Sequence, residues 1–189
     1  MKTQYYNRSN KTINIIKETN LFSNIRDRIN TENNGSTVIV PHVCNNIGVF
    51  NGGFAGQVAN LFPEVKVNYM MLGGNLKLGM CQFVITNTSG KNKHKIIFAN
   101  MIAQNKLLSH NNTRPLNYGA LVYCMNDVRS YIKKCLSDAS YEFENIEIHA
   151  PKFGSGLAGG DWNFIQELIH DLWFDLQVFI YAQNKGNKQ

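Results

Sequence analysis

Two glycine-rich segments carry residue types that could hold a phosphorylated ligand. The first reads PHVCNNIGVFNGGFAG, from Pro41 to Gly56, and the second reads APKFGSGLAGGDW, from Ala150 to Trp162. Glycine lets the backbone adopt positive φ and lets a ligand approach the main chain closely. The N–H groups at the start of a following helix then face that ligand, a geometry suited to phosphate. The two segments therefore predict a phosphate-binding site built from main-chain amides.

Neither segment is a Walker A loop, because no Gly-Lys-Ser/Thr follows the glycines. The first segment lacks the GxGxxG spacing of a dinucleotide-binding turn, and the second has that spacing at Gly154, Gly156 and Gly159, a motif of low specificity by itself. Taken singly, each segment is explained equally well as a turn without a ligand. The presence of two such loops, with asparagines entering the first, favours a ligand held between them beyond the carboxyl ends of the strands.

Two side chains beside these loops could transfer protons. Asp161 ends the second loop, where its carboxylate could position a water or accept its proton, or could cap the helix that follows. His42 ends an apolar run, where a lone histidine is usually a core residue. Its ordinary pKa of about 6.5 would nevertheless suit general acid–base work. Asp161 and His42 are the candidate catalytic residues, and both interpretations stay open for each.

The sequence shows no metal-binding pattern. Its cysteines, at positions 44, 81, 124 and 135, form no CxxC pair, and no two of them combine with histidines at zinc-site spacing. We therefore expect buried free thiols in a reducing compartment, and a site that uses neither a metal nor a cofactor.

Strands and helices must position the two loops, and the hydrophobic pattern predicts both. The clearest helix covers 118–136, where apolar residues recur at three- and four-residue spacing. Alternation of strands with helices predicts an α/β fold with a sheet covered on both faces, in a single domain over 1–189 with a core at about 12–182. Strands are expected at 12–17, 36–44, 80–86, 95–101, 145–149 and 176–181, helices at 21–28, 54–62, 63–71 and 118–136 and after residue 162, and a loop at 30–35.

Composition narrows the class of protein and of partner. The formal net charge is +6, which favours anionic ligands, and a short basic cluster spans Lys91, Lys93, His94 and Lys95. That cluster lies in a polar stretch typical of a hairpin turn, and no aromatic residues interleave with it, so nucleic acid is a minor alternative. No apolar run approaches the roughly 18 residues of a membrane span, and the N-terminus has no signal-like apolar region. We expect a cytoplasmic monomer that does not contact membranes.

The order of the motifs resembles the macrodomain family, in its bacterial and phage branch. HVCNNIGVFNGGFAG is followed by FPEV, LGMCQFV, FANMIAQ, RPLNYGAL and PKFGSGLAGGDW, and the resemblance covers about residues 12–182. It implies a three-layer α/β/α sandwich around a central mixed sheet. It also implies ADP-ribose, or ADP-ribose with a 1″-phosphate or acyl group, as the ligand. Activities in the family are dephosphorylation, deacylation, removal of ADP-ribose from macromolecules, and binding alone.

The resemblance also implies roles for individual residues. Asn45 and Asn46 fall where a distal-ribose asparagine is expected, and Asp161 is the carboxylate nearest the distal ribose. The sequence departs from the family at two places. The usual adenine-binding aspartate after the first strand is missing, so Glu18, Thr19 or Asn20 must substitute for it. Gln104 stands where one glycohydrolase branch has a lysine nucleophile. The loops that would line the diphosphate contribute Gly48, Gly52, Gly53 and Phe54 on one side and Gly154, Ser155, Gly156, Leu157, Ala158 and Gly159 on the other.

Three functions follow from the resemblance. The leading hypothesis is a metal-independent hydrolase that removes the distal-ribose substituent, in its main version an ADP-ribose 1″-phosphate phosphatase. The second is a non-catalytic module that binds or sequesters ADP-ribose. The third is a glycohydrolase that acts on ADP-ribosylated macromolecules, for which the positive charge would assist docking of a polymer.

Overall fold

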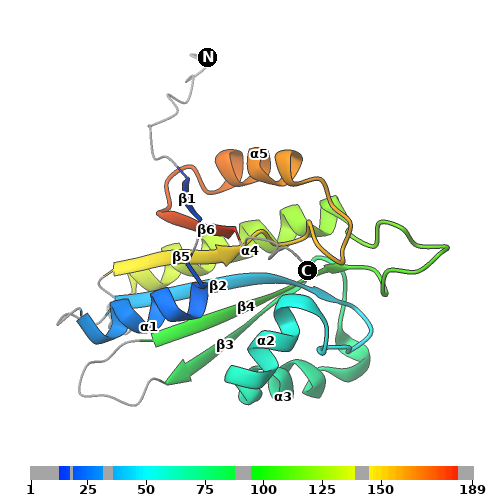
Figure 1. The fold of residues 1–189 in the computed structure, drawn as a ribbon, viewed down its shortest axis with the longest axis horizontal. Helices are drawn as coiled ribbons and strands as arrows, with labels where there is room; N and C mark the ends of the chain where they lie inside the picture. Colours follow the sequence, from blue (N-terminus) through cyan, green and yellow to red (C-terminus); the bar gives the residue numbers. More distant parts are fainter. Residues whose placement is uncertain (1–12, 18, 32–35, 88–94, 139–144, 183–189) are drawn as a thin grey trace, which may run out of the picture.

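The structure, a computed structural model, describes residues 13–17, 19–31, 36–87, 95–138 and 145–182. Six strands form one sheet in the order β1-β6-β5-β2-β4-β3 (Figure 1). All neighbouring strands run parallel except β3, which pairs antiparallel with β4 at the sheet edge. The strands are β1 (Asn14–Lys17), β2 (Ser36–Asn45), β3 (Cys81–Asn87), β4 (Lys95–Gln104), β5 (Asn145–Pro151) and β6 (Val178–Ala182).

Helices cover both faces of this sheet, as its near-continuous apolar strands require. Ile39 of β2 belongs to a buried cluster with α4 (Tyr118–Ser137) and α5 (Trp162–Leu172). Its neighbours Val38 and Val40 belong to a second cluster with α1 (Leu21–Thr31), α2 (Gly53–Leu61) and α3 (Pro63–Met71). This alternation confirms the predicted three-layer α/β/α arrangement around a mixed sheet (Figure 1). The helices are α1 (Leu21–Thr31), α2 (Gly53–Leu61), α3 (Pro63–Met71), α4 (Tyr118–Ser137) and α5 (Trp162–Leu172), with a short 3₁₀ turn at Gly73–Asn75.

Several helices and strands begin or end at other residues than the sequence predicts. The helix α1 continues to Thr31, so residues 30 and 31, expected in a loop, are helical, and residues 32–35 lie outside the described residues. Strand β6 begins at Val178 rather than 176, because the amide of Leu176 donates to the carbonyl of Trp173 and keeps that segment in a turn. Of the basic cluster, only Lys95 is described, and it opens β4.

Caps fix the starts of the two long helices beside the loops. The Asn117 side chain accepts from the amide of Ala120 at the start of α4, and the Asp161 side chain accepts from the amide of Phe164 at the start of α5. Such caps contribute about 1 kcal/mol each. No helix in the described part of the chain is long and apolar enough to cross a membrane.

Candidate functional site

A cavity of about 650 Å³ lies at the carboxyl ends of β2, β4 and β5. This is where an open α/β sheet places its ligands. Both glycine-rich loops reach it, the first between β2 and α2 and the second between β5 and α5. Its wall comprises His42, Val43, Cys44, Asn45, Val49, Gly52, Gly53, Phe54, Ala55, Gln104, Leu107, Leu108, Pro151, Lys152, Phe153, Gly154, Gly156, Leu157 and Ala158.

The first loop is organised around the buried side chain of Asn45. Its Oδ1 accepts from the amides of Ile47 and Val49, both at 3.1 Å, and its Nδ2 donates to the carbonyl of Val49. The Tyr69 hydroxyl donates to the Asn45 carbonyl. Asn45 therefore holds the loop in shape with most of its hydrogen-bonding capacity, in addition to lining the cavity.

A bulge brings Gln104 next to this asparagine. Cys44 pairs with Ile102 but Asn45 pairs with Gln104, so the ladder between β2 and β4 skips one residue. Bulges near a strand end re-aim side chains. The Gln104 amide donates to the carbonyl of Lys106 at 2.9 Å, and Lys106 itself is exposed, has a φ of +61° and does not line the cavity.

Backbone conformation or close packing favours glycine at several positions of the second loop, among them Gly154 and Gly160. Gly154 has a φ of +76°, which disfavours side chains. A Cβ on Gly160 would lie 2.3 Å from Leu116 Cδ2 and 2.7 Å from the carbonyl oxygen of Gly154. The amide of Gly160 donates to that same oxygen at 2.8 Å and closes the loop.

The side chain of Leu157 connects the two loops. Its Cδ1 would lie 3.3 Å from a Cβ on Gly52 and 3.5 Å from one on Gly53. Leu157 is 57% exposed, so it projects over the wall rather than into the core. Phe54, on the same side as these glycines, stacks on Phe22 of α1 with ring centroids 5.4 Å apart.

Charge in the wall is sparse and positive. Among the described residues that line the cavity, Lys152 is the single formally charged side chain, and none of these residues has a carboxylate. The Lys152 ammonium lies 5.3 Å from the centroid of the Trp162 ring, a cation–π contact that leaves it exposed to solvent. The wall thus offers one cation and many main-chain groups, a combination that suits an anion.

His42 is buried and fully partnered. Its Nε2 lies 2.7 Å from Asn100 Oδ1, and the rings of Phe50, Phe54 and Phe98 surround it. Burial lowers the pKa of His42 to about 4, partly offset by the Asn100 hydrogen bond. The imidazole is therefore neutral at pH 7, and its side chain is 1% exposed. Although His42 borders the cavity, this environment matches the core interpretation, and we assign it no proton transfer.

Asp161 lies outside the cavity wall. Its Oδ1 caps α5 through the amide of Phe164 at 3.0 Å, and its own amide donates to the hydroxyl of Tyr118 at 2.8 Å. The carboxylate is exposed at the exit of the second loop. The capping interpretation is therefore observed, while a reaction at Asp161 would require substrate to extend beyond the cavity.

Other predicted site residues also lie outside the wall. Asn46 joins the first loop to the loop after β4, because its Oδ1 accepts from the amide of Lys106 at 2.8 Å and its Nδ2 donates to Asn105 Oδ1 at 3.2 Å. Asn20 accepts from the amide of Phe22 at the start of α1. The remaining predicted residues that do not line the cavity are Thr19, Gly48, Ser155 and Gly159.

Several wall residues were not predicted, although the sequence carries a signal for them. Lys152 lies within the second glycine-rich segment, two residues before Gly154, where a cation favours an anionic ligand. Leu107 and Leu108 form an apolar pair inside an otherwise polar stretch, are 40% and 49% exposed, and line the cavity. An exposed leucine pair in a polar loop is a signal for a binding wall.

The thiols are unreactive by environment. All four cysteines are free, three of them buried and Cys81 half-buried. Burial raises the pKa of Cys44 and of Cys81, and raises that of Cys124 to about 12, so these thiols stay protonated. Within the described residues, no three His, Cys, Asp or Glu side chains are arranged to hold a metal ion.

Comparison with solved structures identifies the fold. A protein from Bacteroides thetaiotaomicron superposes with a TM-score of 0.67 at 21% identity, covering 90% of this chain and 99% of its own. A macrodomain protein from Streptomyces coelicolor gives 0.60 at 22% identity over 90% and 98% of the two chains.

A third similar structure was solved with a bound ligand. Thermosipho africanus DarTG in complex with ADP-ribose gives a TM-score of 0.62 at 18% identity, over 95% of this chain and 43% of that one. No protein-family model matches the chain, and a search of curated protein sequences finds no match. At these identities the likeness establishes the fold.

Proposed function

We propose that this chain, which has the macrodomain fold, binds ADP-ribose or a 1″-substituted ADP-ribose in the cavity between its two glycine-rich loops. The observation that carries the proposal is the meeting of both loops around one cavity of about 650 Å³. That volume is within the roughly 300–1,000 Å³ of small-molecule sites. Support also comes from DarTG of Thermosipho africanus, a protein of similar fold that was solved in complex with ADP-ribose.

The chemistry of the wall suits such a ligand. Main-chain amides of the two loops and the ammonium of Lys152 favour a diphosphate, and no described carboxylate in the wall repels it. Phe54 and Leu157 provide apolar surface for the faces of a sugar or a base. Of the three predicted substitutes for the adenine-binding aspartate, Thr19 and Asn20 do not line the cavity, and Glu18 lies outside the described residues. We propose that Phe54 and its neighbours hold the base by packing.

Calorimetric titration with ADP-ribose tests the proposal through a matched pair of variants. Gly156 lines the cavity, and a Cβ there would meet no atom within 4 Å. Gly74, in the turn after α3, is equally open and lies outside the wall. Gly156→Glu should abolish binding by placing a carboxylate against the diphosphate, whereas Gly74→Glu should bind as the parent does. Equal binding by both variants would refute the assignment of the cavity.

As the finer proposal, we infer hydrolysis of the distal-ribose substituent, with ADP-ribose 1″-phosphate as substrate. Water would attack the phosphomonoester, and inorganic phosphate and ADP-ribose would be the products. The bond between phosphorus and the 1″ oxygen would break, with ADP-ribose as the leaving group, and Lys152 and the loop amides could stabilise the charge on the phosphoryl group. The carboxylate for this step would be Asp161, which caps α5 through Oδ1 and leaves Oδ2 without a protein donor among the described residues.

Turnover and binding alone are separated by ³¹P NMR. Substoichiometric protein should convert ADP-ribose 1″-phosphate to free phosphate, and Asp161→Asn should stop the conversion while ADP-ribose still binds. An unchanged spectrum with retained binding would leave the non-catalytic module as the function. Conversion undiminished in Asp161→Asn would remove Asp161 from the mechanism.

A further inference from the structure

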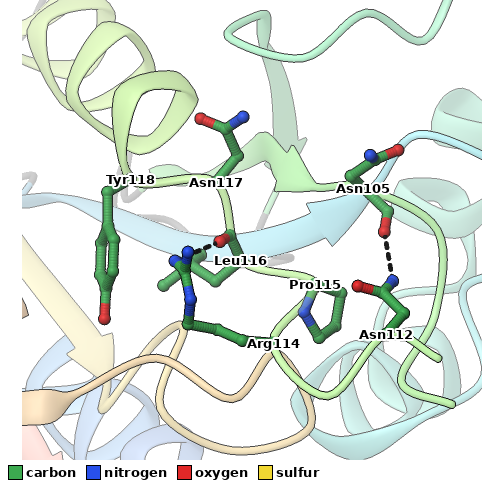
Figure 2. A pocket seen from close by; sticks show the side chains of 7 residues that line it. All are labelled: Asn105, Asn112, Arg114, Pro115, Leu116, Asn117 and Tyr118. Carbon is green, nitrogen blue, oxygen red and sulfur yellow. Dashed lines mark hydrogen bonds between the residues drawn. The ribbon is translucent and has the colours of Figure 1, made fainter. Parts of the chain in front are cut away.

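The described residues also form a second pocket, of about 340 Å³, on the segment that connects β4 to α4 (Figure 2). Two of its polar side chains bind the segment itself: Asn112 donates to the main-chain carbonyl of Asn105 at 2.9 Å, and Arg114 donates to that of Leu116 at 2.8 Å. Figure 2 shows the Asn105 and Asn117 side chains pointing away from the Arg114 guanidinium. These polar groups do not converge on a ligand position, and those that donate stabilise the segment.

Polar side chains do converge beside the first cavity, where they form one row across three strands. His42 of β2 pairs with Asn100 of β4, and Asn100 pairs with Gln82 of β3. Residues paired across neighbouring strands share a face of the sheet. That face carries α1, α2 and α3, because Val40, two residues before His42, belongs to the buried cluster on that side. His42 and Asn100 are 1% and 0% exposed, and Gln82 is half-buried.

The row ends on a main-chain carbonyl of α3, a group that can only accept. Asn68 lies in the last turn of α3, where carbonyls lose their intrahelical donors, and the amide of Leu72 donates to the carbonyl of Tyr69 instead. The Gln82 Nε2 donates to the Asn68 carbonyl at 3.0 Å. The opposite amide orientation would set the Gln82 Oε1 against that oxygen, one acceptor against another. The end of α3 therefore fixes which way the Gln82 amide points.

This orientation is passed along the row from one side chain to the next. The Gln82 Oε1 accepts from Asn100 Nδ2 at 3.0 Å, so Asn100 presents its Oδ1 to His42 Nε2 at 2.7 Å. Because Asn100 Oδ1 can only accept, His42 Nε2 must carry the hydrogen. A neutral imidazole then keeps a lone pair on Nδ1. The Cys44 Sγ lies 3.6 Å from that nitrogen, where its S–H can donate.

His42 and Cys44 both line the cavity, and we call these two residues its floor. We infer that Gln82, which lies outside the wall, is a positioning residue for this floor. Through Asn100 it holds His42 as the Nε2–H tautomer and so keeps the Cys44 thiol hydrogen bonded to Nδ1. The floor then offers a ligand a packing surface without an unpaired donor. The tautomer is a property of the chain alone, whereas its effect on a ligand rests on the proposed binding of ADP-ribose.

Long-range ¹H–¹⁵N spectra of the full chain, labelled with ¹⁵N-histidine and recorded at pH 7, test the tautomer. The His42 signals are assigned by their loss in His42→Gln. In the parent, Nε2 should resonate as a protonated nitrogen and Nδ1 as an unprotonated one. Gln82→Glu offers only acceptors, so Asn100 keeps its orientation and the tautomer should be unchanged. Gln82→Lys offers only donors, which turns the Asn100 amide and should move the His42 hydrogen to Nδ1.

Calorimetric titration of the same variants with ADP-ribose tests the effect on the ligand. The reversed tautomer leaves the Cys44 thiol without its acceptor, so Gln82→Lys should bind about fivefold more weakly than the parent, the equivalent of one neutral hydrogen bond. Gln82→Glu should bind more tightly than Gln82→Lys. Charge alone predicts the opposite order, because a diphosphate favours an added lysine over an added glutamate. Gln177→Lys, at an exposed position before β6 and outside the wall, is the control and should change neither tautomer nor affinity.

Three results would overturn the inference: an Nδ1–H tautomer in the parent or in Gln82→Glu, the same tautomer in Gln82→Lys as in Gln82→Glu, or equal ADP-ribose affinities of these two variants. Backbone amide spectra show whether each variant is folded, and if Gln82→Lys is not, the tautomers of the parent and of Gln82→Glu still decide. If the tautomers follow the prediction but ADP-ribose does not bind the parent, the proposed function fails and the role of Gln82 in fixing the tautomer stands.

Discussion

Replacement of Gly160 by alanine should damage the second loop through a steric conflict that the structure defines. The added Cβ would lie 2.3 Å from Leu116 Cδ2, 2.7 Å from the Gly154 carbonyl oxygen and 3.1 Å from Ile165 Cδ1. Leu116 and Ile165 are buried, and the Gly154 oxygen belongs to the backbone, so no flexible side chain can give way. Overpacking of this kind costs about 1–3 kcal/mol. Loss of the hydrogen bond from Gly160 to Gly154 adds about 1 kcal/mol.

Gly160→Ala should therefore lower the free energy of unfolding by about 2–4 kcal/mol, the sum of these two contributions. Gly74→Ala is the control, because its Cβ would meet nothing within 4 Å and its stability should stay within about 1 kcal/mol of the parent. Urea unfolding at pH 7 measures both, with equal m-values as the check on two-state behaviour. If Gly160→Ala were as stable as Gly74→Ala, the packing of this loop as described would be wrong.

Three further predictions concern individual side chains. Because burial lowers the pKa of His42 to about 4 from its ordinary 6.5, the unfolded chain takes up a proton there that the folded chain does not. The contribution of the neutral imidazole to the free energy of unfolding should therefore be fully present above pH 6.5, and should fall by about 3 kcal/mol as the pH drops towards 4. Urea unfolding across this range should show a shallower decline in His42→Gln. Asp161→Ala should lower the thermal midpoint by removing a cap of about 1 kcal/mol, whereas Asp161→Asn, an equally good cap, should not, and equal midpoints for the two variants would contradict the capping role. Asn45→Ala leaves loop groups unpaired and should cost about 1–3 kcal/mol in urea unfolding and also weaken ADP-ribose binding; parent-like values in both assays would show that the first loop does not depend on Asn45.

The sheet and its helices could be predicted from the sequence because their signals are local. The apolar residues at three- and four-residue spacing in 118–136 predict a helix, and the apolar run from Ser36 to Cys44 predicts a strand. Both elements are observed. The predicted boundaries were wrong at two elements. The sequence carries no strong signal for the end of α1 at Thr31, or for the late start of β6, which follows a local turn from Trp173 to Leu176.

The two loops could also be predicted from the sequence, but the hydrogen bonds that their polar residues form could not. Asparagine and aspartate have the same chemistry whether they hold a ligand or a backbone amide. Only the fold shows that Asn46 binds Lys106 of another loop and that Asn20 caps α1. The role of His42 likewise depends on Asn100, which lies 58 residues away in the sequence and next to it across β2 and β4.

Titration of the ¹⁵N-labelled chain with ADP-ribose distinguishes a ligand held between the two loops from one bound elsewhere. We expect saturable shifts of the amides in Gly52–Ala55 and Gly154–Ala158, the two loops that meet at the cavity. The amides of Gly73, Gly74 and Asn75, which lie outside the cavity wall, should stay unchanged. An unperturbed spectrum, or shifts concentrated away from both loops, would contradict the proposed site.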